Sequence, residues 1–152
     1  MIDKIVIEPG KSIGDFYLGM DKVEAERIIR TTPLFFKIEW DMNECASFIE
    51  VARHPDFNFE LLINGFDRID PFKTKVKEII NNLDVISPYD RGDDLGFTYS
   101  FLQMGITFWR PSNFKEEDMN EAWFKEMPLE NQKEELKQLY FESISVYKPS
   151  QQ

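Results

Sequence analysis

The chain contains a single cysteine, Cys45, and a single histidine, His54, two residue types often used in nucleophilic catalysis. A Cys–His pair acts as nucleophile and base only when the side chains are within hydrogen-bonding reach and a third group orients the histidine. A strand is expected between them, at residues 48–51, and it would place them near its opposite ends. We interpret Cys45 as half-buried at a strand start and His54 as a surface residue before Pro55. The sequence therefore predicts no catalytic residue.

Patterns that bind metals are equally sparse. Structural zinc sites use four Cys or His ligands and catalytic ones commonly use two or three histidines, whereas this chain has one of each. The acidic segment at residues 90–94, DRGDD, lacks the alternating carboxylates and distal glutamate of an EF-hand. Its Gly and Asp content is typical of a solvated turn. We therefore expect no metal site and no cofactor.

Residues 9–14, PGKSIG, contain the Gly, Lys and Ser residue types of a phosphate-binding loop. The pattern G-x-x-x-x-G-K-[ST] is not met, because only one glycine precedes Lys11 and Ser12 and no helix follows directly. The glycines here are expected to form turns. Paired carboxylates suited to glycoside hydrolysis exist by number alone, since nothing in the sequence brings two of them to the required separation.

Length and composition describe one globular domain. The chain has 152 residues, of which 42% are hydrophobic and 14% aromatic, enough to bury a core without a disulfide. A net charge of −10 argues against binding to nucleic acid and to anionic membranes. Asp3, Lys4 and Glu8 interrupt the N-terminal stretch, no apolar run approaches the length of a spanning helix, and cysteine is rare. We expect a cytoplasmic domain at residues 1–148 and a frayed tail at 149–152.

Hydrophobic periodicity predicts an α+β fold. Period-two alternation predicts strands at residues 5–7, 34–40, 48–51, 57–63, 97–102, 106–109 and 141–147. Helical spacing predicts helices at residues 21–30, 70–83 and 115–140, the last broken at Pro128. Short connections favour antiparallel pairing, so we expect a curved antiparallel sheet with helices packed on one face. Each half starts with a helix and continues into hairpin strands, which raises the hypothesis of a diverged internal duplication.

The sequence also predicts where one of these helices begins and which face of another is buried. Asp70 is a good N-cap and Pro71 suits a first helical position, so the central helix is expected to begin there. In the helix that follows Pro128, one buried face is expected to hold Leu129, Leu136, Leu139 and Tyr140.

The excess negative charge is carried by two segments. Residues 38–70 hold eight acidic and two basic residues, residues 111–152 hold nine and five, and the remainder is balanced. Neighbouring placement of the two segments would form an acidic face that steers a basic partner. The alternative is diffuse acidity that keeps the protein soluble. Trp109 and Trp123 lie beside charged segments, as interface anchors do, although each could equally cap the core.

Residues 9–24, PGKSIGDFYLGMDKVE, form a turn-rich segment that leads into the first expected helix. This segment resembles the helix entry of compact helix-plus-sheet modules such as BamE outer-membrane assembly lipoproteins and β-lactamase inhibitory proteins. It also resembles small immunity-type proteins encoded beside bacterial polymorphic toxins. The resemblance implies protein binding rather than catalysis and assigns no functional residue. We expect no signal peptide or lipobox like those of the lipoproteins, which argues against an envelope role.

Together these observations predict a non-enzymatic protein-binding domain, an immunity protein that neutralises a basic bacterial toxin through an acidic face. The alternative is a small-molecule-binding or enzymatic domain with an aromatic-lined pocket between sheet and helices that holds at least two convergent polar groups. Cys45 and His54 in that pocket would favour the alternative, and a large apolar surface patch would instead indicate a structural subunit. The expected partner contacts are Glu39, Asp41, Glu44, Glu50, Glu116, Glu117, Asp118 and Trp123.

Overall fold

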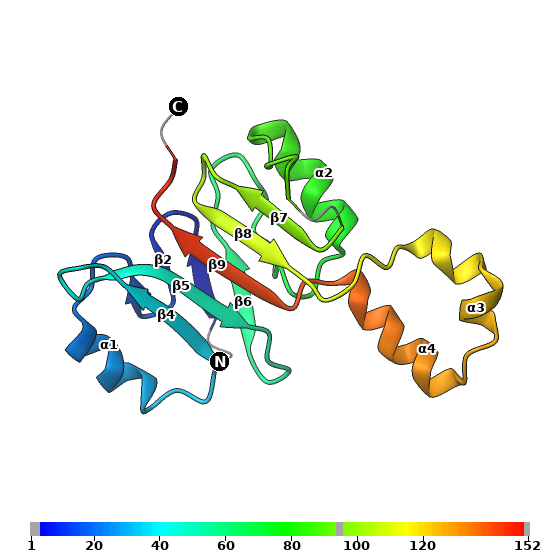
Figure 1. Cartoon of the computed structure of the whole chain (residues 1–152), viewed down its shortest axis with the longest axis horizontal. Coiled ribbons are helices and arrows are strands. Elements are labelled where there is room, and N and C mark those ends of the chain that lie inside the picture. Colours follow the sequence, from blue (N-terminus) through cyan, green and yellow to red (C-terminus); the bar gives the residue numbers. More distant parts are fainter. Residues whose placement is uncertain (1–3, 94–95, 151–152) are drawn as a thin grey trace.

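The computed structural model describes residues 4–93 and 96–150. Asp3, Asp94 and the tail residues 151–152 lie outside the described residues. The chain forms two sheets with helices, which confirms the predicted α+β class (Figure 1). No helix within the described ranges is long and apolar enough to cross a membrane.

The strands form two sheets, whereas a single antiparallel sheet was predicted. The five-stranded sheet is antiparallel and has the order β4 (Phe36–Trp40), β5 (Ala46–Ala52), β9 (Ser143–Tyr147), β8 (Ile106–Trp109), β7 (Thr98–Phe101). The four-stranded sheet has the order β3 (Phe16–Tyr17), β2 (Ser12–Ile13), β1 (Lys4–Glu8), β6 (Asn58–Leu61). Here β1 and β6 run parallel, so purely antiparallel pairing was a wrong prediction.

The main core lies between the two sheets and includes one face of helix α2 (Val76–Ile86). Strand alternation directs one side of the five-stranded sheet into it. The inward side chains that are fully buried include Ile49, Val51, Phe101, Ile106, Phe108, Ile144 and Val146. Helix α2 adds Val76, Ile79, Ile80 and Leu83, at helical spacing, and helix α1 (Lys22–Ile29) adds Ala25.

Helix α2 begins at Val76, with Lys75 at the N-cap, and not at residue 70 as predicted. The Asp70 carboxylate is used differently. Its oxygens accept hydrogen bonds from the backbone N–H groups of Phe59 (3.0 Å) and Phe72 (2.9 Å), which ties β6 to the turn before the helix. The acceptor chemistry of a cap is present, but it serves a turn.

Residues 111–140, which we call the helical arm, project from the two-sheet body (Figure 1). The arm contains the 3₁₀ turn η1 (Glu116–Asn120), α3 (Ala122–Lys125), α4 (Leu129–Leu136) and η2 (Lys137–Leu139). Its small core of Phe114, Phe124 and Leu139 is separate from the main one. Leu129 is 74% exposed, so its predicted place on the buried face was wrong.

Two turns tie the sheets together at one end. The Gly10 N–H donates to the Gly105 carbonyl at 3.0 Å, and both glycines have positive φ angles. A Cβ atom on Gly105 would collide with the Tyr147 carbonyl and with Gly10, so close backbone approach requires glycine here. The Ser150 N–H donates to the Leu102 carbonyl at 2.7 Å, so this part of the expected frayed tail contacts the body.

Candidate functional site

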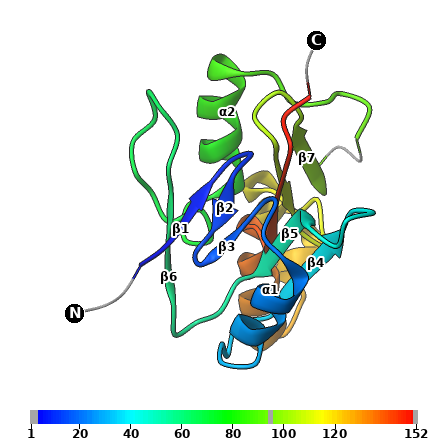
Figure 2. The same ribbon diagram turned by 90° about the vertical axis from the view of Figure 1, so that its left-hand side faces the viewer.

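The four-stranded sheet and α2 pack on one side of the five-stranded sheet, and the described helices leave its other side open. Figure 1 looks onto this side, and the turned view in Figure 2 places α2, β1 and β6 behind it. We call this surface the open face. Strand alternation and register assign to it the side chains that point away from the core. They are Lys37, Glu39, Phe48, Glu50, Ala52, Thr98, Ser100, Thr107, Trp109, Ser143, Ser145 and Tyr147.

A row of polar side chains crosses the open face from β5 to β7. Glu50 lies opposite Ser145, which lies opposite Thr107, which lies opposite Ser100. Thr107 Oγ1 donates to Ser100 Oγ at 3.0 Å, and it lies 2.6 Å from the hydroxyl oxygen of Tyr147. Burial raises the pKa of Tyr147, so the phenol stays protonated at neutral pH.

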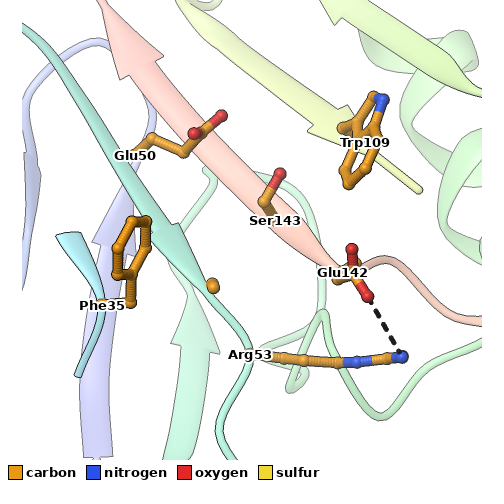
Figure 3. Close-up of a pocket in the computed structure, with 7 residues that line it drawn as sticks. Phe35, Glu50, Arg53, Trp109, Glu142 and Ser143 are labelled. Atoms are coloured by element: carbon orange, nitrogen blue, oxygen red, sulfur yellow. Dashed lines mark ion pairs between the residues drawn. The ribbon is translucent and has the colours of Figure 1, made fainter. Parts of the chain in front are cut away.

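A hollow of about 570 Å³ lies at the β5–β9–β8 part of the open face. Figure 3 shows Phe35 on one side of it and Trp109 on the other, with Ser143 between them. Phe35 is 72% exposed and Trp109 is 38% exposed. At the lower end, Arg53 pairs with Glu142 at 3.7 Å. The hollow therefore combines two accessible aromatic side chains with polar and charged groups.

Glu50 is the carboxylate of this hollow whose environment is most unusual. Partial burial raises its pKa, the nearby Glu39 adds to the rise, and Lys37 opposes it. Desolvation of this kind disfavours the charged form. A cation brought to the hollow would therefore pair with the Glu50 carboxylate, whose charge the surrounding residues offset only in part.

The acids expected from the first acidic segment occupy two places. Glu39 and Glu50 lie on the open face. Asp41 and Glu44 lie in the turn between β4 and β5, where Asp41 Oδ1 accepts hydrogen bonds from the N–H groups of Asn43 (2.8 Å) and Cys45 (3.0 Å). Asp41 thus shapes the turn, and Glu44 holds a left-handed position in it.

The acids expected from the second segment lie on the helical arm and are engaged locally. Glu116 pairs with Lys75 at 3.2 Å and Glu117 pairs with Lys77 at 3.9 Å, both on or beside the start of α2. Asp118 accepts the Lys115 N–H at 3.0 Å.

Trp123, also on the arm, is 49% exposed and packs edge-on against Phe114 and Phe124. The arm and strands β4 and β5 lie at opposite ends of the molecule (Figure 1), so these two groups of acids lie far apart. The two acidic segments meet at the hollow instead, through Glu50 and Glu142.

Cys45 and His54 lie before and after β5, as the sequence predicts. Cys45 Sγ contacts the Asn43 carbonyl at 3.7 Å, and His54 Nδ1 accepts the Asp56 N–H at 3.1 Å. Neither lines the hollow. In the described part of the chain, no group of three or more His, Cys, Asp or Glu residues is arranged to hold a metal ion.

A second cavity, of about 470 Å³, lies between α2, β7 and the helical arm. It matches the place expected for a small-molecule pocket, between sheet and helices. Tyr89, Tyr99 and Phe114 contribute aromatic walls, and the nearly buried Arg110 contributes a charge. Cys45 and His54 do not line it.

Sequence reasoning missed several residues of these sites. Phe35 carried a usable signal, because it is an aromatic residue in the polar phase of the alternation at residues 34–40. Arg53, Glu142 and Ser143 carried none, because their meeting depends on the pairing of β5 with β9.

Comparison with known proteins adds no assignment to either site: no family model, curated protein or solved structure matches the chain. The resemblance of residues 9–24 to immunity-type proteins and BamE-like modules therefore stays a prediction. In the structure this segment forms the short strands β2 and β3 and enters α1 at Lys22.

Proposed function

We propose that this protein is a non-enzymatic binding domain that receives a basic protein partner on the open face of its five-stranded sheet. The biological setting that best fits this activity is that of a cytoplasmic immunity protein, which neutralises a bacterial toxin by occupying its basic active surface. Neutralisation requires tight binding and no chemistry from the binder, which agrees with the separation of Cys45 from His54.

The observation that carries the proposal is the position of Glu50 in a hollow between Phe35 and Trp109. An arginine or lysine side chain of a partner would pair with Glu50 and pack against the Trp109 ring. Aromatic residues surrounding a desolvated charged pair are the usual composition of an interface hot spot. Glu39, on the same face, extends the acidic surface.

Net charge supports the choice of a basic partner. A chain with a charge of −10 attracts cationic surfaces over a distance and accelerates encounter with them. The proposed contact set differs from the one expected from the sequence. It keeps Glu39 and Glu50 and adds Phe35 and Trp109. It leaves out Glu116 and Glu117, which lie on the arm and pair with Lys75 and Lys77.

Co-expression with the product of the adjacent gene tests the proposal. We expect the wild-type chain to protect cells from that product and to bind it in calorimetric titration. Trp109→Ala and Glu50→Lys should each weaken binding by roughly 30-fold or more, the loss typical of hot-spot residues.

Matched controls are available elsewhere on the surface. Trp123→Ala removes a tryptophan of similar exposure from the arm, and Glu26→Lys makes the same charge change on α1. Both should bind normally. The proposal is refuted if the folded wild-type chain neither binds nor protects, or if the control variants lose as much affinity as the open-face variants.

A second candidate function, small-molecule binding, is favoured by the cavity beside α2 and by the buried arginine in its wall.

A further inference from the structure

Arg110 is the side chain that joins the body to the helical arm. It is only 5% exposed. Its Nε donates to the Gly96 carbonyl at 2.6 Å, and its Nη1 donates to the Phe114 carbonyl at 2.8 Å and the Gln138 carbonyl at 2.6 Å. These three bonds use Nε and Nη1 and bring together the loop before β7 and both ends of the arm.

Within residues 4–93 and 96–150, the groups that hydrogen-bond to Arg110 are neutral. Its hydrogen-bond acceptors are backbone carbonyls, and the ion pairs among residues 4–93 and 96–150 do not include it. Burial lowers its pKa, and the neighbouring Tyr99 opposes that change. Desolvation of a buried charge is costly in free energy, and an anion brought close would offset part of that cost.

Arg110 lines the cavity between α2, β7 and the arm, which has a volume of about 470 Å³. That volume lies in the range of small-molecule sites. Three lysines also line it: Lys75, Lys77 and Lys115. The apolar part of the wall includes Val76, Ile80, Phe114 and Leu139.

We propose that this cavity binds a small organic anion, with its phosphate or carboxylate group at Arg110 and the lysines and its apolar body against Val76, Ile80 and Leu139. Glu116 and Glu117 form ion pairs with Lys75 and Lys77, at 3.2 Å and 3.9 Å. The ligand's oxyanion therefore competes with these carboxylates for the same lysines. This site is separate from the open face and does not depend on a protein partner.

Phenyl phosphate is a suitable probe because it joins an oxyanion to a small apolar ring. In a titration followed by backbone amide NMR, we expect saturable shifts of Tyr99, Gly96 and Asn113, which line the cavity, with a Kd of about 1 mM or lower. Phenol and inorganic phosphate should each bind more weakly, because each supplies only one of the two contacts.

Two charge variants at the rim of the cavity should change the affinity for phenyl phosphate in opposite directions, and both leave Arg110 in place. Glu116→Gln should strengthen phenyl phosphate binding about threefold to tenfold, because Lys75 loses its internal partner. Lys75→Gln should weaken it by a similar factor. Glu26→Gln and Arg27→Gln make the same charge changes on α1 and should leave the affinity within about twofold, since salt screens distant charges.

The proposal is overturned if phenyl phosphate produces no saturable shifts, or if its shifts fall on the open face or spread over the whole surface. It is also overturned if the rim variants and the α1 variants change the affinity equally, which would indicate only a general charge effect.

Discussion

The two-sheet body and the helical arm differ in the size of the core on which each depends. The body core takes side chains from both sheets and from α1 and α2, with Phe101, Phe108 and Phe141 all fully buried. The arm core has three buried side chains: Phe114 from the loop before η1, Phe124 from α3 and Leu139 from η2. Short helices are marginal without tertiary packing. The arm is therefore ordered mainly by its attachment to the body.

Carboxylates are also used differently in the two regions. Glu116 and Glu117 of the arm pair with lysines of the body, so they help to hold the arm against α2. Glu50 of the open face is partly desolvated and lies near a second acid, Glu39. Glu116 and Glu117 contribute to attachment of the arm, whereas Glu39 and Glu50 lie on the open face.

Removal of a core phenylalanine should have the largest effect on stability, and it tests whether the body and the arm depend on separate cores. Phe108→Ala should lower the free energy of unfolding by about 3–5 kcal/mol in urea denaturation, because Phe108 is fully buried between Phe101 and Phe141. Phe124→Ala should cost less globally, because the arm can open without unfolding the body. Amide exchange should then accelerate at residues 114–139 alone. Equal losses in both variants, with exchange accelerated everywhere, would show that body and arm form one cooperative unit.

The attachment itself is tested by Arg110→Met. The substitution leaves the carbonyls of Gly96, Phe114 and Gln138 without their donor, so we expect a loss of about 2–4 kcal/mol and faster amide exchange in the arm. Arg27→Met, at an exposed position of α1, should stay within about 0.5 kcal/mol of wild type. An Arg110→Met protein as stable as the control would mean that the arm needs no anchor.

Glu50→Gln and Glu116→Gln should have the smallest effects on stability, and these effects should have opposite signs at pH 7. Burial raises the pKa of Glu50 in the folded state, so the folded protein binds this proton more tightly than the unfolded chain. Stability therefore falls as the pH rises through the ordinary glutamate range and the raised folded pKa. Glu50→Gln should be more stable than wild type at pH 7, and the gain should disappear in acid where the wild-type carboxyl is protonated.

Glu116→Gln should instead lose about 0.5 kcal/mol or less at pH 7, because it removes an exposed ion pair. Thermal unfolding of both variants at pH 3.5 and pH 7 measures the contrast. The same sign for both substitutions at pH 7 would contradict the different roles assigned to the two carboxylates.

Local patterns in the sequence were sufficient for most of the elements. Alternation predicted β4, β5 and β9, and the glycine-bearing turn at residue 105 predicted the β7–β8 hairpin. The parallel pairing of β1 with β6 was missed, because their registry joins residues more than 50 positions apart and leaves no local trace. The start of α2 was missed because Asp70 satisfies the N–H groups of Phe59 and Phe72 instead of a helix end.

The candidate site was predictable only in its chemical character. The charge count located acidic segments, yet the ion pairs of Glu116 and Glu117 with lysines some 40 residues earlier depend on tertiary structure. Glu39 and Glu50, which were predicted as partner contacts, lie on the open face for a general reason, since acids in alternating strands face away from the core. Arg110 gave no signal as a buried charge, because its environment is built from three distant segments.

The position of β9 has a consequence for biosynthesis. β9 is the last of the described strands to leave the ribosome, yet it lies at the centre of the five-stranded sheet, between β5 and β8. Until it arrives, the β4–β5 and β7–β8 hairpins have no strand to join them, and each presents an unpaired edge. Assembly of the five-stranded sheet therefore has to wait for β9, and its long-range contacts should make it slow. A separately supplied peptide of residues 141–150 should complete the five-stranded sheet of a chain truncated before residue 141. The protein would then fold as a complex of two fragments, controlled by addition of the peptide.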